Sequence, residues 1–237
     1  MMRWLQRIEQ PLKAAGSVAE KKLMRDFAHK FGLVYFGTIN ARNDEYELVR
    51  GVTLHPTHHD RHFIIGNYKG YDITLLQRHV ELTHPQHESA HYKWSIVQAD
   101  LHQRRLPHVL ITSQHHDRLF FDNLQIKLAN FQRLNAELIP DHAFARHFSV
   151  FTVTDGLDEI PTILTPQIMA ALVKYFKGFD VEMFDDQVIV YTSQPRLTHP
   201  LLQEMLREAL WLAMHLDEQV AGETASTPDQ QVPDQNE

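Results

Sequence analysis

Residues 62–82 read HFIIGNYKGYDITLLQRHVEL, and this stretch decides the fold. It is rich in the β-branched and aromatic residues that favour strands. In its middle, the run Gly66-Asn67-Tyr68-Lys69-Gly70 places glycines where a positive φ is least costly, which is typical of a tight reversal. The stretch therefore predicts an antiparallel hairpin.

Four further stretches of similar composition surround this hairpin and are separated by polar turns. They are LVYFGTIN (33–40), YELVRGVTL (46–54), HYKWSIVQADL (91–101) and LPHVLITS (106–113). No segment between them is long enough to supply the helical crossovers that parallel strands need. We therefore expect residues 33–118 to form a region of antiparallel strands.

Helices are expected near both ends of the chain. Ser17-Val18-Ala19-Glu20 has the pattern of a capping box, and Gly32 suits the left-handed position that ends a helix. Together they predict a helix over 17–31 and assign residues 1–32 to N-terminal helices. Thr198-His199-Pro200 begins a second long helix with an apolar face near the other end of the chain.

The remaining part, residues 119–221, mixes strands and helices before that C-terminal helix. HFSVFTVT (147–154) predicts a strand, Thr165-Pro166 a helix start, and FDVEMFDDQVIVYTS (179–193) two short strands around the acidic turn Asp185-Asp186. The predicted fold class is α+β: antiparallel strands followed by a mixed region, flanked by N- and C-terminal helices. We expect one domain over 33–221 and a disordered tail over 222–237, because that tail has almost no apolar content.

Composition excludes several classes of protein. With 237 residues and no cysteine, the chain has no disulfide, thiolate metal ligand or thiol nucleophile. A net charge of −7 argues against nucleic-acid binding, which relies on Lys and Arg. No stretch approaches the roughly 20 apolar residues of a membrane span. We expect a soluble, cytoplasmic protein.

The first residues, MMRWLQRIEQPLKAAG, leave one alternative open. Arg3, Arg7 and Lys13 alternate there with Trp4, Leu5, Ile8 and Leu12. A helix packed on its own domain is the preferred interpretation. An amphipathic helix lying on an anionic membrane is the alternative.

Three groups of histidines are the candidate metal sites. They are His55, His58, His59 and His62 with Asp60; His84, His87 and His91 with Glu88; and His115 and His116 with Asp117. Zinc needs three or four such ligands in a tetrahedral array. The segment HESAH (87–91) satisfies the His-Glu-x-x-His pattern, but Pro85 precedes it and a strand-like run follows at once. We expect polar loops at HPTHHDRH (55–62) and HESAH, with metal binding as the alternative.

No other pattern indicates catalysis. The chain has no Gly-x-Ser-x-Gly turn, phosphate-binding loop or dinucleotide-binding glycine pattern. We therefore assign no catalytic or cofactor-binding residue and expect no cofactor.

A series of motifs resembles a group of uncharacterised bacterial proteins that share a domain of unknown function. The series is a Leu-Pro-His strand, a Phe-x-Val strand, a Leu-Thr-Pro-x-x-Met helix and an acidic hairpin ending in Tyr. It is carried here by Leu106, Pro107, His108, Phe148, Val150, Leu164, Thr165, Pro166, Met169, Phe179, Asp180, Glu182 and Tyr191. The resemblance covers roughly residues 60–195 and implies an architecture, without implying any chemistry.

Three functions follow as hypotheses. The first is a non-enzymatic interaction or scaffold domain that presents a surface to another protein. The second is a metal-binding protein or metallohydrolase, with His87 and His91 as ligands and Glu88 as general base. The third is a pH-responsive module, because protonating all 17 histidines would move the charge from −7 to −7 + 17 = +10. The oligomeric state has no signature in the sequence.

Overall fold

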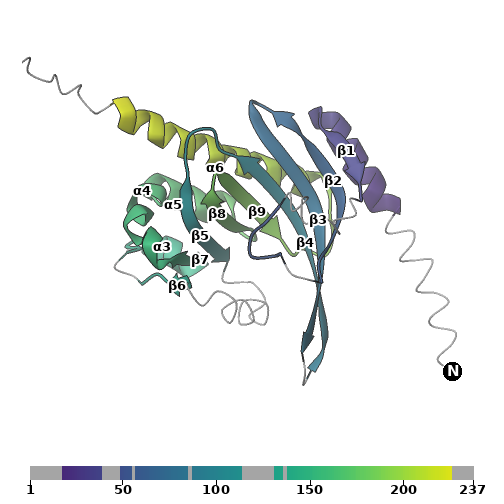
Figure 1. Ribbon diagram of the computed structural model, residues 1–237, viewed down its shortest axis with the longest axis horizontal. Coiled ribbons are helices and arrows are strands. Elements are labelled where there is room, and N and C mark those ends of the chain that lie inside the picture. Colours follow the sequence, from purple (N-terminus) through teal and green to yellow (C-terminus); the bar gives the residue numbers. More distant parts are fainter. Residues whose placement is uncertain are drawn as a thin grey trace, which may run out of the picture.

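One antiparallel sheet organises the chain. The computed structural model describes residues 18–38, 49–54, 57–84, 87–113, 131–135 and 138–225. Within these residues, nine strands form a single sheet in the order β1-β2-β3-β4-β9-β8-β5-β7-β6 (Figure 1). Every pair of neighbouring strands runs antiparallel. The strands are β1 (Val34–Gly37), β2 (His59–Tyr68), β3 (Tyr71–His84), β4 (His87–Asp100), β5 (Leu106–Ser113), β6 (Phe131–Arg133), β7 (Phe148–Val153), β8 (Asp180–Asp185) and β9 (Gln187–Thr192).

The hairpin predicted from residues 62–82 is confirmed. Strands β2 and β3 pair from His59↔His79 to Tyr68↔Tyr71. The turn between them consists of Lys69 and Gly70, whose φ angles are 54° and 90°. Two positive φ angles in succession match the right-handed twist of the flanking strands.

The predicted helices are present, and the hydroxyl caps of two of them are seen. Residues 18–31 form a helix that ends before Gly32, where φ is 68°. The hydroxyl of Thr165 accepts from the Ile168 amide at 3.3 Å, and that of Thr198 accepts from the Leu201 amide at 3.3 Å. The remaining helical elements are α3 (His142–His147), η2 (Thr154–Glu159), α4 (Ile160–Ile163), α5 (Pro166–Tyr175) and α6 (His199–Ala225). The α+β prediction, in which an N-terminal and a C-terminal helix flank the strands in sequence, is confirmed.

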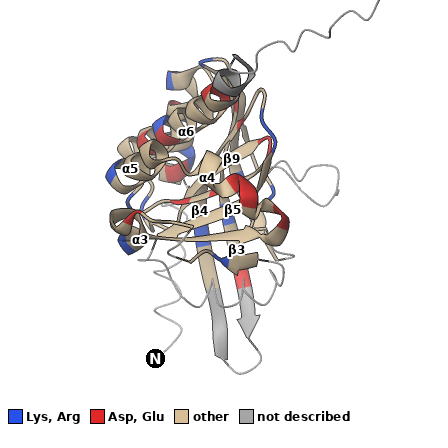
Figure 2. Ribbon diagram, turned by 90° about the vertical axis from the view of Figure 1, so that its left-hand side faces the viewer, with Lys and Arg blue, Asp and Glu red and all other residues tan. Residues whose placement is uncertain are grey.

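The helices cover one face of the sheet and enclose the main core. Figure 2 shows α5 and α6 together on this side of the strands. The apolar stripe of α6 is fully enclosed, and its members are Leu202, Leu206, Ala209, Ala213 and Leu216. Helix 18–31 contributes Met24 and Phe27 to the same cluster. Burying this stripe is what keeps α6 on the sheet.

The opposite face of the sheet carries a second apolar cluster. Consecutive residues alternate between the clusters, so that Leu75 and Val190 lie in the first while Leu76 and Tyr191 lie in the second. Val49 and Val52, from the short segment 49–54, belong to the second cluster. We call segment 49–54 the strap. The central strands are therefore buried on both faces.

Four details of the sequence-based prediction are wrong. The described part of 46–54 is not a strand but a turn, in which the Leu54 amide donates to the Gly51 carbonyl at 3.0 Å. His59–His62 belong to β2 and not to a loop. HESAH begins β4, where the backbone pairs with β3. Finally, α6 continues to Ala225, beyond the expected start of the tail at residue 222.

The N-terminal segment 1–17, with Ser17 of the predicted capping box, and the tail 226–237 lie outside the described residues. Among the residues that are described, no helix is both long and apolar enough to cross a membrane.

Candidate functional site

A bulge in β2 creates the first unusual feature. Arg61 pairs with Gln77 and Ile64 pairs with Leu75, so two residues of β2 share the place opposite one residue of β3. One of the two, His62, has a φ of 59°. The other, Phe63, packs into the second apolar cluster. The bulge thus lets His62 face helix 18–31 next to Arg61, because an extra residue re-aims the side chains around it.

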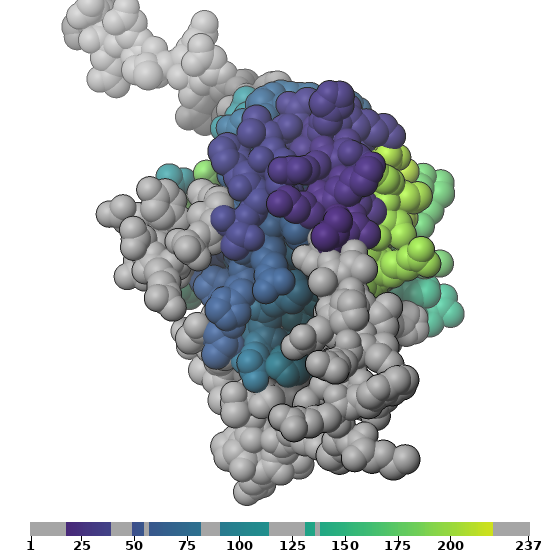
Figure 3. All heavy atoms as spheres, turned by 90° about the vertical axis from the view of Figure 1, so that its right-hand side faces the viewer, coloured from purple at the N-terminus to yellow at the C-terminus, as the bar shows by residue number. Residues whose placement is uncertain are grey.

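These two side chains line a pocket of about 570 Å³ between helix 18–31 and strands β1 and β2. We call it the basic pocket. Its lining consists of Lys21, Arg25, Tyr35, Phe36, Gly37, Thr38, Arg61 and His62. In Figure 3 the purple residues of helix 18–31 and β1 lie together on one face, beside the blue residues of β2.

The charge of the basic pocket is opposite to that of the whole chain. Three of its lining residues, Lys21, Arg25 and Arg61, are exposed cations, and no aspartate or glutamate is among the lining residues that the structure describes. The nearby Glu20 forms an ion pair with Lys93. The chain as a whole carries −7. Guanidinium forks suit bidentate binding of carboxylate or phosphate, so the chemistry of the pocket favours an anionic ligand.

The floor of the pocket is a histidine–tyrosine contact. The Tyr35 hydroxyl lies 2.9 Å from Nδ1 of His62, which is buried. The Arg25 guanidinium lies 5.5 Å from the centre of the Tyr35 ring, at cation–π distance. Burial lowers the pKa of His62, and Glu20 opposes that effect. His62 is therefore neutral at pH 7, and the Tyr35 contact is a hydrogen bond between uncharged groups.

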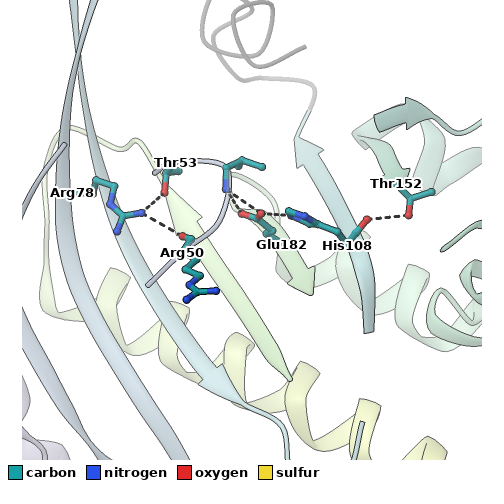
Figure 4. A network of polar contacts seen from close by, with 7 residues as sticks. Arg50, Thr53, Arg78, His108, Thr152 and Glu182 are labelled. Carbon is teal, nitrogen blue, oxygen red and sulfur yellow. Dashed lines mark hydrogen bonds and ion pairs between the residues drawn. The ribbon is translucent and has the colours of Figure 1, made fainter. Parts of the chain in front are cut away.

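The second unusual feature is a buried polar network that holds the strap (Figure 4). Arg78 on β3 is only 1% exposed. Its guanidinium donates to both carboxylate oxygens of Asp60 at 2.8 and 2.7 Å. The same group donates to the strap at the Val49 carbonyl (2.7 Å), the Arg50 carbonyl (3.3 Å) and the Thr53 hydroxyl (3.1 Å). One buried cation thus joins three consecutive parts of the chain.

Glu182 on β8 holds the other side of the strap. The Val52 amide donates to both of its oxygens, at 3.0 and 2.9 Å. Nε2 of His108, on β5, lies 2.5 Å from Oε1 of the same carboxylate. The His108 carbonyl in turn accepts from the Thr152 hydroxyl at 2.9 Å.

A carboxylate–imidazole pair is able to move a proton, but this one is committed to structure. The hydrogen bonds of the described residues link the His108 and Glu182 side chains to the strap amide and to no nucleophilic side chain. His108 also packs against Phe131 and Phe184, with ring centres 4.6 and 4.9 Å away. We therefore regard this network as the anchor of the strap.

The structure separates the histidines of HPTHHDRH. His62 lines the basic pocket, whereas Asp60, the carboxylate of the run, pairs with Arg78 on the other face of the sheet. His59 stands opposite His79 on β3. His55 lies outside the described residues. The run therefore supplies two residues, Arg61 and His62, to the basic pocket and does not act as a unit.

The other two histidine groups give no ligand set that can be described. His84 on β3 pairs with His87 on β4, and His91 stands opposite Glu81. The side chains of 82–90, Glu88 among them, are outside the description, as are His115, His116 and Asp117. In the part of the chain that the structure does describe, no three His, Asp or Glu side chains are grouped to hold a metal ion.

Asp185, from the predicted acidic turn, lies at the turn between β8 and β9 with a φ of 54°.

Sequence reasoning named His62, Asp60, His108 and Glu182 for other reasons, but it missed the cations of both features. Lys21 and Arg25 come from a helix, Tyr35 from β1 and Arg61 from β2, and no motif links them. Arg78 did leave a signal, because a cation inside the apolar run ITLLQRHVEL needs a buried partner.

Comparisons with known proteins support the fold. No protein-family model matches the chain, and no curated protein is significantly similar to it in sequence. Among solved structures it is similar to the crystal structure of the mycobacterial trehalose monomycolate transport factor A, TtfA. The TM-score is 0.56 at 10% sequence identity, and the match covers 84% of this chain and 93% of TtfA. Such a likeness shows a shared fold. The resemblance of residues 60–195 to uncharacterised bacterial proteins stays a prediction.

Proposed function

We propose that this protein is a non-enzymatic binding module that holds an anionic group of its partner in the basic pocket. One observation carries the proposal: three exposed cations surround a pocket whose described lining residues include no carboxylate, in a chain whose net charge is −7. Cations gathered on a negatively charged protein repel one another less when an anion binds between them. This gives a defined surface to the interaction role that the sequence predicts.

The chemistry of the pocket supports binding rather than catalysis. Lys21, Arg25 and Arg61 attract and orient an anion, and the His62–Tyr35 pair offers uncharged polar atoms at the floor. The alternative metallohydrolase is less well supported, because HESAH lies at the start of a strand and not on the helix that its proposed role requires. The proposal keeps the expectation of a cytoplasmic location.

The fold likeness agrees with this class of function without defining the ligand. TtfA is named as a mycobacterial trehalose monomycolate transport factor, and that role is a statement about TtfA. A shared fold hosts many functions, so the ligand of this chain has to be argued from its own pocket.

Titration with inorganic phosphate tests the proposal. We expect phosphate to shift the NMR signals of the His62 ring and of the Gly37 and Thr38 amides, with chloride at equal ionic strength as the reference. The triple variant Lys21→Gln, Arg25→Gln and Arg61→Gln should lose these shifts. A control triple variant, Lys69→Gln, Arg105→Gln and Lys174→Gln, removes three exposed cations elsewhere and gives the same charge of −7 − 3 = −10. Equal responses of the two variants would refute the proposal.

A further inference from the structure

The rim of the basic pocket is apolar as well as cationic. Phe36, which lines the pocket, is 59% exposed. Val18, the first described residue of helix 18–31, is 69% exposed. These two are among the few large apolar side chains that the described residues leave on the surface. A water-facing pocket for a small anion does not need them.

The apolar and cationic side chains share one stripe of helix 18–31. Val18, Lys21 and Arg25 are spaced i, i+3 and i+7, which places them on the same side of the helix. Lys21 and Arg25 face the pocket together with Phe36. Exposed apolar and cationic groups on one side of a helix are the chemistry of an interface with anionic lipids.

The preceding sequence continues the same chemistry up to this point. Residues 1–17 place Arg3, Arg7 and Lys13 among Trp4, Leu5, Ile8 and Leu12, and they lead directly into Val18. An acidic peptide would satisfy the cations of the pocket, but it would leave this second series of basic and apolar residues without a role. An anionic bilayer binds basic and apolar side chains alike.

We propose that the basic pocket and its apolar rim dock the protein on an anionic bilayer, with a lipid phosphate between Lys21, Arg25 and Arg61 and the Phe36 side chain inserted among the lipids. This inference rests on the proposed function, because it names the anion that the pocket holds. The lipid headgroups supply the phosphate that the cations bind, and the boundary between headgroups and acyl chains takes up the apolar side chains of the rim.

Vesicle co-sedimentation of the full chain tests the inference. We expect binding to vesicles of phosphatidylcholine mixed with anionic phosphatidylglycerol, no binding to phosphatidylcholine alone, and weaker binding as salt is raised. Each cation near an anionic surface contributes about fivefold to partitioning, so the triple variant Lys21→Gln, Arg25→Gln and Arg61→Gln should bind roughly a hundredfold more weakly.

Two matched controls separate the docking surface from a general effect of charge or hydrophobicity. The triple variant at Lys69, Arg105 and Lys174 should keep wild-type binding. Phe36→Ser should weaken binding to anionic vesicles several-fold, whereas Met214→Ser, at a side chain that is 41% exposed on α6, should leave it unchanged. Far-ultraviolet circular dichroism confirms that each variant is folded.

The outcomes distinguish this inference from the proposed function. If the protein does not bind anionic vesicles, or if both triple variants bind them equally, the membrane inference is wrong. If phosphate or a polyglutamate peptide still shifts the pocket signals in that case, the proposed function stands with a different partner. If phosphate also fails, both proposals are wrong.

Discussion

The carboxylate of Glu182 occupies the space that a side chain on Gly51 would need. A Cβ at residue 51 would lie 2.6 Å from Oε2 and 3.1 Å from Cδ of Glu182. Gly51 also has a φ of 89°, a conformation that other L-residues rarely adopt. The strap can therefore reach Glu182 only with glycine at this position.

We predict that Gly51→Ala lowers the free energy of unfolding by about 2–4 kcal/mol. Roughly 1 kcal/mol comes from the positive φ. The rest comes from displacing Glu182 from the Val52 amide, since a buried carboxylate that loses a hydrogen bond costs about 1–3 kcal/mol. Urea denaturation followed by circular dichroism measures the difference.

Gly70→Ala is the matched control for this prediction. Gly70 has a φ of 90°, but a Cβ there would meet no atom within 4 Å. This variant should therefore lose only the roughly 1 kcal/mol of backbone strain. Equal losses at Gly51 and Gly70 would mean that the contact with Glu182 contributes nothing.

The Arg78–Asp60 pair should behave as a buried ion pair does. The two side chains are 1% and 5% exposed and stand opposite each other on neighbouring strands. Arg78→Met leaves Asp60 charged and buried and also removes three bonds to the strap, so we predict a loss of about 3–5 kcal/mol. The double variant Arg78→Met with Asp60→Leu should regain part of that loss, because no buried charge is left unpaired. Thermal and urea unfolding of the single and double variants measure the coupling.

A surface ion pair provides the contrast. Lys22 and Asp26 pair on helix 18–31 with side chains 77% and 47% exposed. Lys22→Met should leave the urea midpoint close to that of the wild type, because water screens the pair. A loss at Lys22 similar to that at Arg78 would show that burial is not the deciding factor.

The strap also shows why part of the fold escaped sequence reasoning. The hairpin around Lys69-Gly70 and the helix starts at Thr165 and Thr198 depend on neighbours in sequence, and all three were predictable. The strap has strand-like composition, yet its shape is set by Arg78, 29 residues from Val49, and by Glu182, 130 residues from Val52. Distant partners of this kind override local preference.

The candidate site could not be predicted from the sequence for a similar reason. The histidine run was visible, but a single bulge in β2 sends His62 to one face of the sheet while Asp60 faces the other. Sequence spacing does not reveal a bulge whose extra residue is a histidine with positive φ, since glycine or asparagine is the usual occupant. The cations Lys21 and Arg61 then meet only through the packing of helix 18–31 on the sheet.

Gln77 is a position where a substitution should make the fold more stable. It is 0% exposed, and neither polar atom of its amide has a hydrogen-bond partner among the residues that the structure describes. We predict that Gln77→Met raises the free energy of unfolding by about 1–2 kcal/mol, because the thioether has a similar volume and no amide to desolvate.

Gln98→Met is the control for Gln77. Gln98 is also buried, but its Nε2 donates to the Asp100 carboxylate at 2.7 Å. Its replacement should therefore lower stability or leave it unchanged. If both substitutions shift the urea midpoint in the same direction, hydrogen bonding does not explain the result at Gln77.

The stability of the protein should fall as the pH drops below 6.5, because of histidines near the basic pocket. Burial lowers the pKa of His79 to about 4, and the positive charges of Lys93 and Arg61 add to that effect while Glu20 opposes it. Burial also lowers the pKa of His62. In the unfolded chain, His79 takes up a proton near pH 6.5, whereas in the folded protein it remains neutral down to about pH 4. The contribution of neutral His79 is therefore complete above pH 6.5 and is lost as the pH falls towards 4.

Comparing wild type with His79→Gln isolates this contribution from the carboxylates that titrate in the same range. The stability difference between the two proteins should change by about 1–2 kcal/mol between pH 7 and pH 4.5, less than full burial would give because the ring is only partly enclosed. Urea midpoints at four pH values across this range measure the difference. Parallel curves for the two proteins would show that His79 titrates alike in the folded and unfolded states.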